Sequence, residues 1–184
     1  MQMTSYRKRY LDNNYHTNWH GPIIANHANT VKEMTGVLNY LEIGVHTGET
    51  FNLVVPNTTS ALAVDNNPDC AQHLQGGQFI CSTSDEFFQS YEDDLLFEII
   101  FIDGLHSKEQ VEKDFNNSLK VLRDGGTIYM HDTWPEIESN TIPQICGDVW
   151  KFAEEVERNY ERCFTYQEFP GLTMVQPDPV KRDI

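Results

Sequence analysis

An alternation of short apolar runs with helical segments constrains the fold of this chain more than any other sequence feature. The runs end in Asp, Glu or Gly, and several are apolar almost throughout. Strands that are covered on both faces of a parallel sheet have this pattern, and the segments between the runs are long enough for crossover connections. Strands are therefore predicted over residues 37–43, 60–64, 78–81, 96–102 and 127–130.

The segments around these strands carry helix and hairpin signals. Ser107 is an N-cap candidate for a helix over 108–122, with Gln110 completing a capping box. A second helix is predicted over 149–160, and Pro22 favours a helix start in the N-terminal segment. Two closing strands, 163–169 and 172–175, are expected to pair as an antiparallel hairpin.

These elements predict an α/β fold. We expect a Rossmann-like, doubly wound, mostly parallel sheet with helices on both faces and a C-terminal antiparallel hairpin. A length of 184 residues is typical of one domain. We expect the chain to divide into a helical N-terminal segment over 1–36, a core domain over 37–176 and a loose tail over 177–184.

Charge and cysteine content narrow the class of partner. The chain carries 28 Asp and Glu against 13 Lys and Arg, a net charge of -15. Affinity for nucleic acids and for anionic membranes comes from Lys and Arg, so a small-molecule partner fits better than either. The most apolar stretch, 95–102, is too short to span a bilayer. The four cysteines form no C-x-x-C motif or disulfide framework, so a reducing compartment, the cytoplasm, is expected.

The first three predicted strands are followed by residues that suit a nucleoside ligand. Gly44 allows a sharp turn close to a ligand, although the glycine spacing is shorter than in dinucleotide-binding loops. Asp65, followed by Asn66, can accept both ribose hydroxyls. Ser84 or Asp85 can meet an adenine edge, and helix capping explains either residue equally well. Each motif alone is also an ordinary turn, but together they favour a nucleoside site.

The fourth and fifth predicted strands end in Asp and His pairs. Asp103 and His106 follow one strand, and His131 and Asp132 follow the other. Neighbouring strands lie about 4.8 Å apart, so the two carboxylates would be close together. Such a pair is unfavourable unless a cation or a proton lies between them. A divalent metal or acid/base chemistry is the functional interpretation, and turn-capping aspartates with hydrogen-bonded histidines are the alternative.

These motifs in this order resemble the class I S-adenosylmethionine-dependent methyltransferases. Within that class the chain is similar to methyltransferase family 24, which is related to macrocin-type sugar O-methyltransferases and cephalosporin hydroxylase-like proteins. The resemblance covers roughly residues 38–175, and its most specific part runs from 101–107 through Gly125 and Gly126 to His131 and Asp132. Residues 147–151 also look like a family segment.

The resemblance implies that residues 37–176 form an S-adenosylmethionine-dependent methyltransferase domain. It implies that the turn after the first strand holds the methionine part of the cofactor, that Asp65 with Asn66 holds the ribose, and that Ser84 or Asp85 lies near the adenine. The residues implied for the methionine part are Glu42, Gly44, His46, Thr47 and Gly48.

The resemblance also bears on a metal. Macrocin-type relatives bind Mg²⁺ through carboxylates after strands four and five, and Asp103 and Asp132 match those positions. His131 stands where the relatives often have a second acid. Asp103, Asp132 and His131 are therefore the metal-ligand candidates. The histidine favours either a metal-free site with a histidine base or a divalent transition metal.

The expected reaction is methyl transfer from S-adenosylmethionine to a hydroxyl of a sugar or another hydroxylated metabolite. His106 or His131 is the candidate base, since histidine titrates near neutrality, and Asp103 is the third catalytic candidate. The alternatives are a nicotinamide-dependent oxidoreductase and a non-catalytic cofactor-binding or interaction module. The acceptor pocket is expected to come from the N-terminal segment, the loop over 133–146 or a partner subunit, so a homo-oligomer stays open. Candidate wall residues are His16, Trp19, His20, His27 and Trp134.

Overall fold

A single seven-stranded sheet organises the chain in the computed structural model, which describes residues 18–178. The strand order is β3-β2-β1-β4-β5-β7-β6. The N-terminal part of the predicted helical segment, with His16, and the end of the predicted tail lie outside the described residues. The strands are β1 (Asn39–Ile43), β2 (Ser60–Asp65), β3 (Gln78–Cys81), β4 (Phe97–Ile102), β5 (Leu122–His131), β6 (Cys163–Tyr166) and β7 (Leu172–Val175).

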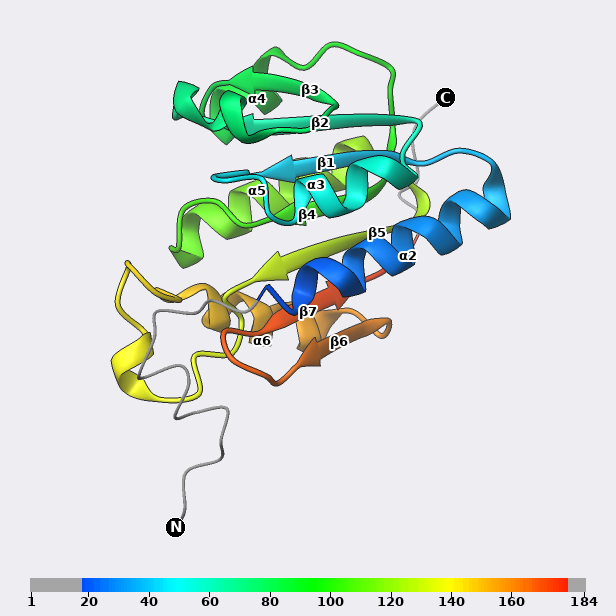
Figure 1. Cartoon of the computed structure of the whole chain (residues 1–184). Helices are drawn as coiled ribbons and strands as arrows, with labels where there is room; N and C mark the ends of the chain where they lie inside the picture. Colours follow the sequence, from blue (N-terminus) through cyan, green and yellow to red (C-terminus); the bar gives the residue numbers. More distant parts are fainter. Residues whose placement is uncertain (1–17, 179–184) are drawn as a thin grey trace.

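The sheet is parallel except at its C-terminal edge. β1 pairs in parallel with β2 and β4, β2 with β3, and β4 with β5. β7 is antiparallel to both β5 and β6, so the last strand of the chain lies between these two strands in the sheet. The strand order reverses between β1 and β4, which is where doubly wound sheets bind ligands. The parallel strands point their carboxyl ends to the left in Figure 1. The predicted fold class is confirmed.

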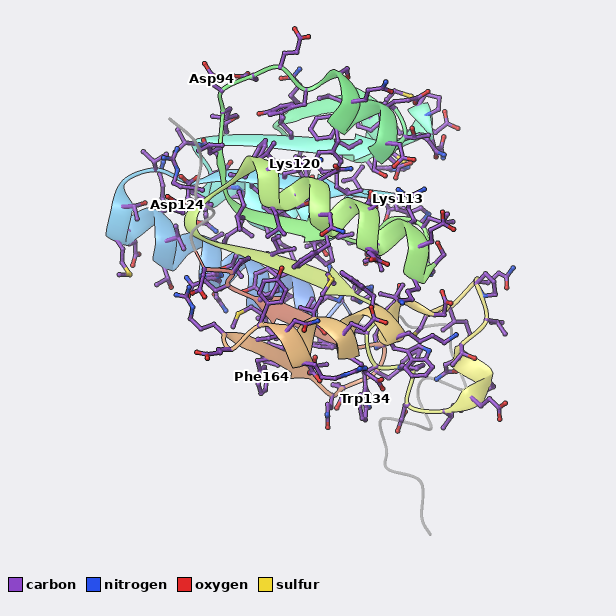
Figure 2. The ribbon with its side chains drawn as sticks, turned by 180° about the vertical axis from the view of Figure 1, so that it is seen from behind. Asp94, Lys113, Lys120, Asp124, Trp134 and Phe164 are labelled. Atoms are coloured by element: carbon purple, nitrogen blue, oxygen red, sulfur yellow. The ribbon has the colours of Figure 1, made fainter. Side chains whose placement is uncertain are left out.

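Helices cover both faces of the sheet. Figure 1 shows α2 and α3 in front of the strands, and Figure 2, from behind, shows α5 and α6 over the opposite face with Lys113 and Lys120 on α5. The α-helices are α2 (His20–Thr35), α3 (Phe51–Val54), α4 (Ser84–Ser90), α5 (Lys108–Val121) and α6 (Val149–Asn159). Short 3₁₀ turns are η1 (Val55–Asn57), η2 (Pro68–His73) and η3 (Glu138–Asn140).

Two hydrophobic clusters lie on the two faces and explain the apolar runs. Successive strand residues point to opposite sides, so Tyr40 packs with Phe51 of α3 while Leu41 packs with Phe115 of α5. All five residues of β1 and all six of β4 are buried. Both faces of these strands are therefore covered, and no polar alternation survives in their sequence.

The structure differs from the predicted boundaries in a few places. β5 begins at Leu122, where we expected the end of the preceding helix, because the backbone of Leu122 is already extended and pairs with Phe97. The register then shifts, and Gly125, with a φ of +79°, lies in this irregular stretch. α2 begins at His20, which places Pro22 in its first turn, where its missing N–H is not needed.

Two further findings concern the whole described chain. No helix within residues 18–178 combines the length and apolar character needed to cross a bilayer. The thiols of all four cysteines are free in the structure.

Candidate functional site

A cavity of about 890 Å³ opens at the carboxyl ends of the parallel strands. It brings together almost all residues that the sequence predicts for a site, because parallel strands end at the same edge of the sheet. Gly48 is the exception, and it shapes the turn instead by donating its N–H to the carbonyl of Val45. The predicted residues that line the cavity are Glu42, Gly44, His46, Thr47, Asp65, Asn66, Ser84, Asp85, Asp103, His106, His131 and Asp132.

The turn after β1 is packed tightly against the turn after β4. Gly44 has a φ of +84°, and a Cβ there would lie 2.2 Å from the backbone oxygen of Asp103. The Gly44 N–H donates to the carbonyl of Val64, 2.8 Å away. Glycine is thus required at position 44 both for its backbone conformation and for the close approach.

Asp65 fixes this turn from the end of β2. Its Oδ2 accepts the backbone N–H of His46 at 2.9 Å, and its Oδ1 accepts the N–H of Asn67 at 2.9 Å. Each carboxylate oxygen keeps a further lone pair, so Asp65 can still accept ribose hydroxyls. His46 lies in the left-handed region with a φ of +45°.

Glu42 is a carboxylate buried beneath the turn. Its side chain accepts the hydroxyl hydrogen of Tyr40, with 2.6 Å between the oxygens, and the residue is 2% exposed. Burial raises the pKa of Glu42 well above its ordinary value, although the hydrogen bond from Tyr40 opposes the shift, and the charge of Asp103 adds to it. A buried carboxylate at a cavity wall is stabilised by a cationic ligand group.

The start of α4 shows whether Ser84 or Asp85 caps this helix, a question that the sequence left open. Thr83 is the N-cap of α4, and Thr83 and Glu86 form a complete capping box. Ser84 and Asp85 are therefore not needed as caps. The side-chain amide of Gln110 donates to Ser84 Oγ at 3.1 Å and to Asp85 Oδ1 at 3.0 Å, which ties this wall to α5.

The ends of β4 and β5 bring the predicted Asp and His pairs into one cluster. His131 Nδ1 lies 3.0 Å from Asp103 Oδ1 and 3.6 Å from Asp132 Oδ2. His106 Nε2 lies 3.1 Å from Asp132 Oδ2. Asp132 is 4% exposed and has a φ of +60°, an uncommon conformation that marks a constrained turn. The juxtaposition follows from the parallel pairing of β4 with β5.

Charges within the cluster oppose the effect of burial. Burial by itself would lower the pKa of His131, but the carboxylates of Asp103 and Asp132 raise it well above its ordinary value. Burial would raise the pKa of Asp103, but His131 and, more weakly, His20 and His106 lower it. Attraction between the His131 ring and the Asp103 carboxylate thus offsets part of the cost of burying both groups.

His20 belongs to this cluster, which the sequence did not reveal. Its ring centroid lies 4.1 Å from that of His131, and its Nε2 lies 3.1 Å from Thr50 Oγ1. The sequence suggested His20 only as one of several wall residues, because position 20 precedes the first strand and no spacing links it to the others. Of the other suggested wall residues that the structure describes, Trp19, His27 and Trp134 are not among those lining the cavity.

The remaining cavity wall comes from segments outside the strand ends. Asn18 and His20 contribute from the start of the described chain, Gln144 and Ile145 from the loop after β5, and the pair 169–170 from the turn before β7. The first of these segments reaches the His and Asp cluster, because the ring of His20 lies against that of His131. The sequence named two of the three, and the turn before β7 was missed because a Pro-Gly pair reads as a plain hairpin turn.

Solved structures show which known proteins share this fold. The chain shares the fold of methyltransferases, among them the O-methyltransferase TomG from Streptomyces achromogenes, solved in complex with SAM (TM-score 0.69, 12% identity, 94% of this chain and 86% of that chain covered). An O-methyltransferase from Bacillus cereus, in complex with SAH, is similar (TM-score 0.66, 15% identity, 92% and 86% covered). An rRNA methylase from Streptococcus thermophilus shares it too (TM-score 0.62, 9% identity, 86% and 94% covered).

The sequence identifies the family to which the chain belongs. A family model described as a methyltransferase domain, type 24, matches residues 41–133, just over half of the chain. The chain belongs to this methyltransferase family, and the predicted resemblance is confirmed. The match contains all four residues of the strand-end cluster, whereas His20 lies before it. No curated protein matches the sequence significantly.

Proposed function

We propose that this chain transfers the methyl group of S-adenosylmethionine to a hydroxyl of a small molecule. The observation that carries the proposal is that one cavity contacts both the nucleoside-type turns after β1 and β2 and the Asp and His cluster after β4 and β5. A methyl donor bound along the turns after β1 and β2 would present its methyl group to an acceptor at the Asp and His cluster. The volume of about 890 Å³ suits two small ligands and lies within the usual range of ligand pockets.

In the cofactor half of the proposal, each part of S-adenosylmethionine contacts a different part of the cavity wall. Asp65 accepts the ribose hydroxyls, and the wall of Ser84 and Asp85 faces the adenine edge. The buried carboxylate of Glu42 supplies the negative charge that the ammonium group of the methionine part needs. The backbone from Gly44 to Gly48 follows the methionine part, and its closeness to Asp103 keeps the donor next to the acceptor.

In the acceptor half of the proposal, His106 and Asp132 together remove the hydroxyl proton of the acceptor. In the displacement the acceptor oxygen bonds to the methyl carbon, the carbon–sulfur bond breaks, and its electron pair stays on the sulfur. The hydroxyl proton passes to the neutral imidazole of His106, and the carboxylate of Asp132, 3.1 Å from His106 Nε2, stabilises the imidazolium that forms. His106 is favoured over His131 because its side chain is 28% exposed against 10%, which gives an acceptor easier access. Most of the rate enhancement comes from aligning the two reactants.

A small acceptor is favoured by charge. The fold itself serves both O-methyltransferases and an rRNA methylase, so it leaves the acceptor open. A net charge of -15 repels a phosphate backbone, and the enclosing segments form a cavity instead of an open basic groove. The four free thiols support a reducing compartment such as the cytoplasm.

Magnesium fits this donor set poorly. Mg²⁺ takes oxygen ligands in near-ideal octahedral geometry. Asp103 and Asp132 offer oxygens, but His131 Nδ1 lies against both carboxylates and occupies their shared space. No step of the proposed reaction is therefore assigned to Mg²⁺.

Binding and transfer test the proposal separately. We expect calorimetry to show binding of S-adenosylmethionine and S-adenosylhomocysteine and no binding of NAD. With labelled S-adenosylmethionine and a panel of hydroxylated metabolites, we expect His106→Ala to lower kcat by about 10²-fold or more, in line with loss of a general base, while S-adenosylhomocysteine affinity stays near that of wild type. His73→Ala is the control, because His73 is exposed and is not among the residues lining the cavity.

Binding of NAD alone would favour the oxidoreductase alternative. Cofactor binding with no transfer to any acceptor class would favour a non-catalytic module. Full activity of His106→Ala would remove His106 from the proton path and leave the methyltransferase assignment intact.

A further inference from the structure

The segment 146–148 joins the loop after β5 to α6 and packs against the loop that carries His106. It lies outside residues 41–133, the region that the family model matches. A Cβ on Gly147 would lie 1.7 Å from the backbone oxygen of His106 and 3.0 Å from its Cβ. Gly147 also has a φ of +56°. Glycine is therefore required at position 147 both for its backbone conformation and for its close approach to His106.

Asp148 holds the same loop from its other end. Asp148 is the N-cap residue of α6, but its carboxylate caps α5 instead, because Oδ1 accepts the backbone N–H of Lys108 at 2.6 Å. Lys108 begins α5 two positions after His106, and this N–H is one of the first-turn donors that have no partner within their own helix. The ammonium group of Lys108 pairs with Glu155 of α6 at 2.7 Å, so backbone and side chain both tie the start of α5 to α6.

The residue before Gly147 contacts the other half of the proposed proton path. Cys146 is fully buried, and its thiol interacts with the carboxylate of Asp132. Burial raises the pKa of Cys146, and the nearby charge of Asp132 adds to the shift, so the thiol stays neutral. The backbone N–H groups of Cys146 and Gly147 donate to the carbonyls of Asn140 and Ile142, at 3.0 and 2.9 Å. The segment is thus fixed within its own loop and touches both partners of the proton path.

The position of the His106 ring depends on its backbone. Within residues 18–178 the ring has one polar contact, the 3.1 Å between Nε2 and Asp132 Oδ2, and its Nδ1 is buried without a hydrogen-bond partner. A ring held at one atom follows any displacement of the main chain that carries it. A misplacement of about 1 Å in a reacting group can lower a rate by about 10²-fold. Contacts to the His106 backbone can therefore control the reaction without touching a substrate.

We propose that Gly147 and Asp148 are positioning residues that hold His106 against Asp132 for proton removal. Gly147 sets how closely the backbone of His106 approaches the start of α6, and Asp148 sets where α5 begins. Neither residue is among those lining the cavity, so both act through His106. The inference rests on the proposed function in taking His106 as the base. A purely structural role would change stability and leave the His106 ring and kcat of the folded protein unchanged.

Nuclear magnetic resonance and kinetics on the full chain test the inference. The nitrogen signals of the His106 ring are identified by their loss in His106→Ala. We expect Gly147→Ala to shift these signals and to lower kcat by about 10–100-fold, while KM for S-adenosylmethionine and affinity for S-adenosylhomocysteine stay near those of wild type. Gly125→Ala is the control, because Gly125 has a φ of +79° and its Cβ would meet nothing within 4 Å. It should keep both the ring signals and kcat.

A second set of variants keeps the test decisive should Gly147→Ala fail to fold by circular dichroism. Asp148→Ala should shift the same signals and lower kcat less than Gly147→Ala, because only one backbone contact is lost. Asp148→Asn keeps an oxygen that accepts the Lys108 N–H and should restore both readouts. Asp93→Ala is the matched control, because Asp93 Oδ1 accepts the N–H of Leu95 at 3.1 Å and Asp93 is not among the residues lining the cavity.

Three results would overturn the inference. They are unchanged ring signals in the folded Gly147→Ala or Asp148→Ala variant, shifted signals with unchanged kcat, and equal losses in Asp148→Ala and Asp148→Asn. Failure of the proposed function gives a different result, because wild type would then bind S-adenosylmethionine and methylate no acceptor. The ring signals need no turnover, so they report the contact between Gly147 and His106 in that case as well.

Discussion

At the scale of single residues, the cavity is built from groups that serve the fold and a ligand together. Asp65 accepts two backbone N–H groups and keeps further lone pairs, which the proposed ribose contact would use. Glu42 differs from Asp65, because its buried carboxylate is held mainly by Tyr40 and lowers the stability of the ligand-free protein. A cationic ligand group would offset that cost. Such residues trade stability for binding.

Glu42→Gln is expected to separate the two effects. Because the pKa of Glu42 is raised in the folded state, its ionisation opposes folding. At low pH both states are protonated. As the pH rises above the ordinary carboxyl value, the unfolded chain loses its proton first and the folded state loses relative stability. The variant cannot ionise, so at neutral pH we expect it to be more stable by about 1 kcal/mol, roughly 2–4 °C in Tm.

The same variant should bind S-adenosylmethionine about tenfold more weakly, because a charge-assisted contact is lost. Thermal unfolding at several pH values and calorimetry provide the two measurements. Equal stability of wild type and variant at neutral pH would show that Glu42 is ionised without penalty. An unchanged affinity would move the ammonium contact elsewhere.

At the scale of elements, the site depends on how closely the turns after β1 and β4 approach each other. Helix caps and strand pairing set the position of each turn, but glycine sets the distance between them. A Cβ on Gly44 would meet the Asp103 backbone, whereas a Cβ on Gly125 would meet nothing within 4 Å. Both glycines have positive φ, of +84° and +79°. Substitutions at the two positions therefore introduce similar backbone strain and differ in the steric clash.

Gly44→Ala is expected to lose about 2–4 kcal/mol of unfolding free energy and most of the cofactor affinity. Backbone strain accounts for about 1–2 kcal/mol of that loss, and displacement of the neighbouring turn accounts for the rest. Gly125→Ala should show the strain alone and keep cofactor binding. Urea unfolding of both variants gives the comparison, and equal losses would mean that the close approach contributes nothing.

At the scale of the whole molecule, a net charge of -15 disfavours nucleic acid as the acceptor. Acidic residues outnumber basic ones by 28 to 13, and within residues 18–178 Lys108, Arg123 and Arg158 are each in an ion pair. Lys and Arg side chains that are paired with carboxylates are less able to neutralise phosphates and release their counterions.

We therefore expect no measurable RNA affinity, even at low ionic strength. Filter binding with structured RNA at about 50 and 200 mM salt measures it, because electrostatic binding weakens steeply over that range. A basic RNA-binding domain assayed alongside is the positive control. Affinity that falls linearly with the logarithm of salt concentration would contradict the small-molecule assignment and favour a nucleic-acid acceptor.

The sequence by itself determined the strands, most helices and the residues at the strand ends. Apolar runs such as Phe97–Ile102 identify buried parallel strands from local order alone, and parallel strands necessarily end at one edge. Glu42, Asp65 and Asp103 could therefore be assigned to one site without a structure. Local capping signals were less decisive. Only the structure shows that Thr83 caps α4, so that Ser84 and Asp85 are not needed as caps.

Tertiary structure alone decided what surrounds the acceptor side. His20 meets His131 because α2 packs across the sheet, and no periodicity or spacing in the chain encodes that contact. The turn before β7 reaches the cavity because β7 lies antiparallel beside β5. Local patterns specify elements and their ends, whereas contacts between segments far apart in the sequence arise only when the hydrophobic faces pack. The proposed cofactor side belongs to the first kind of information, and the proposed acceptor side to the second.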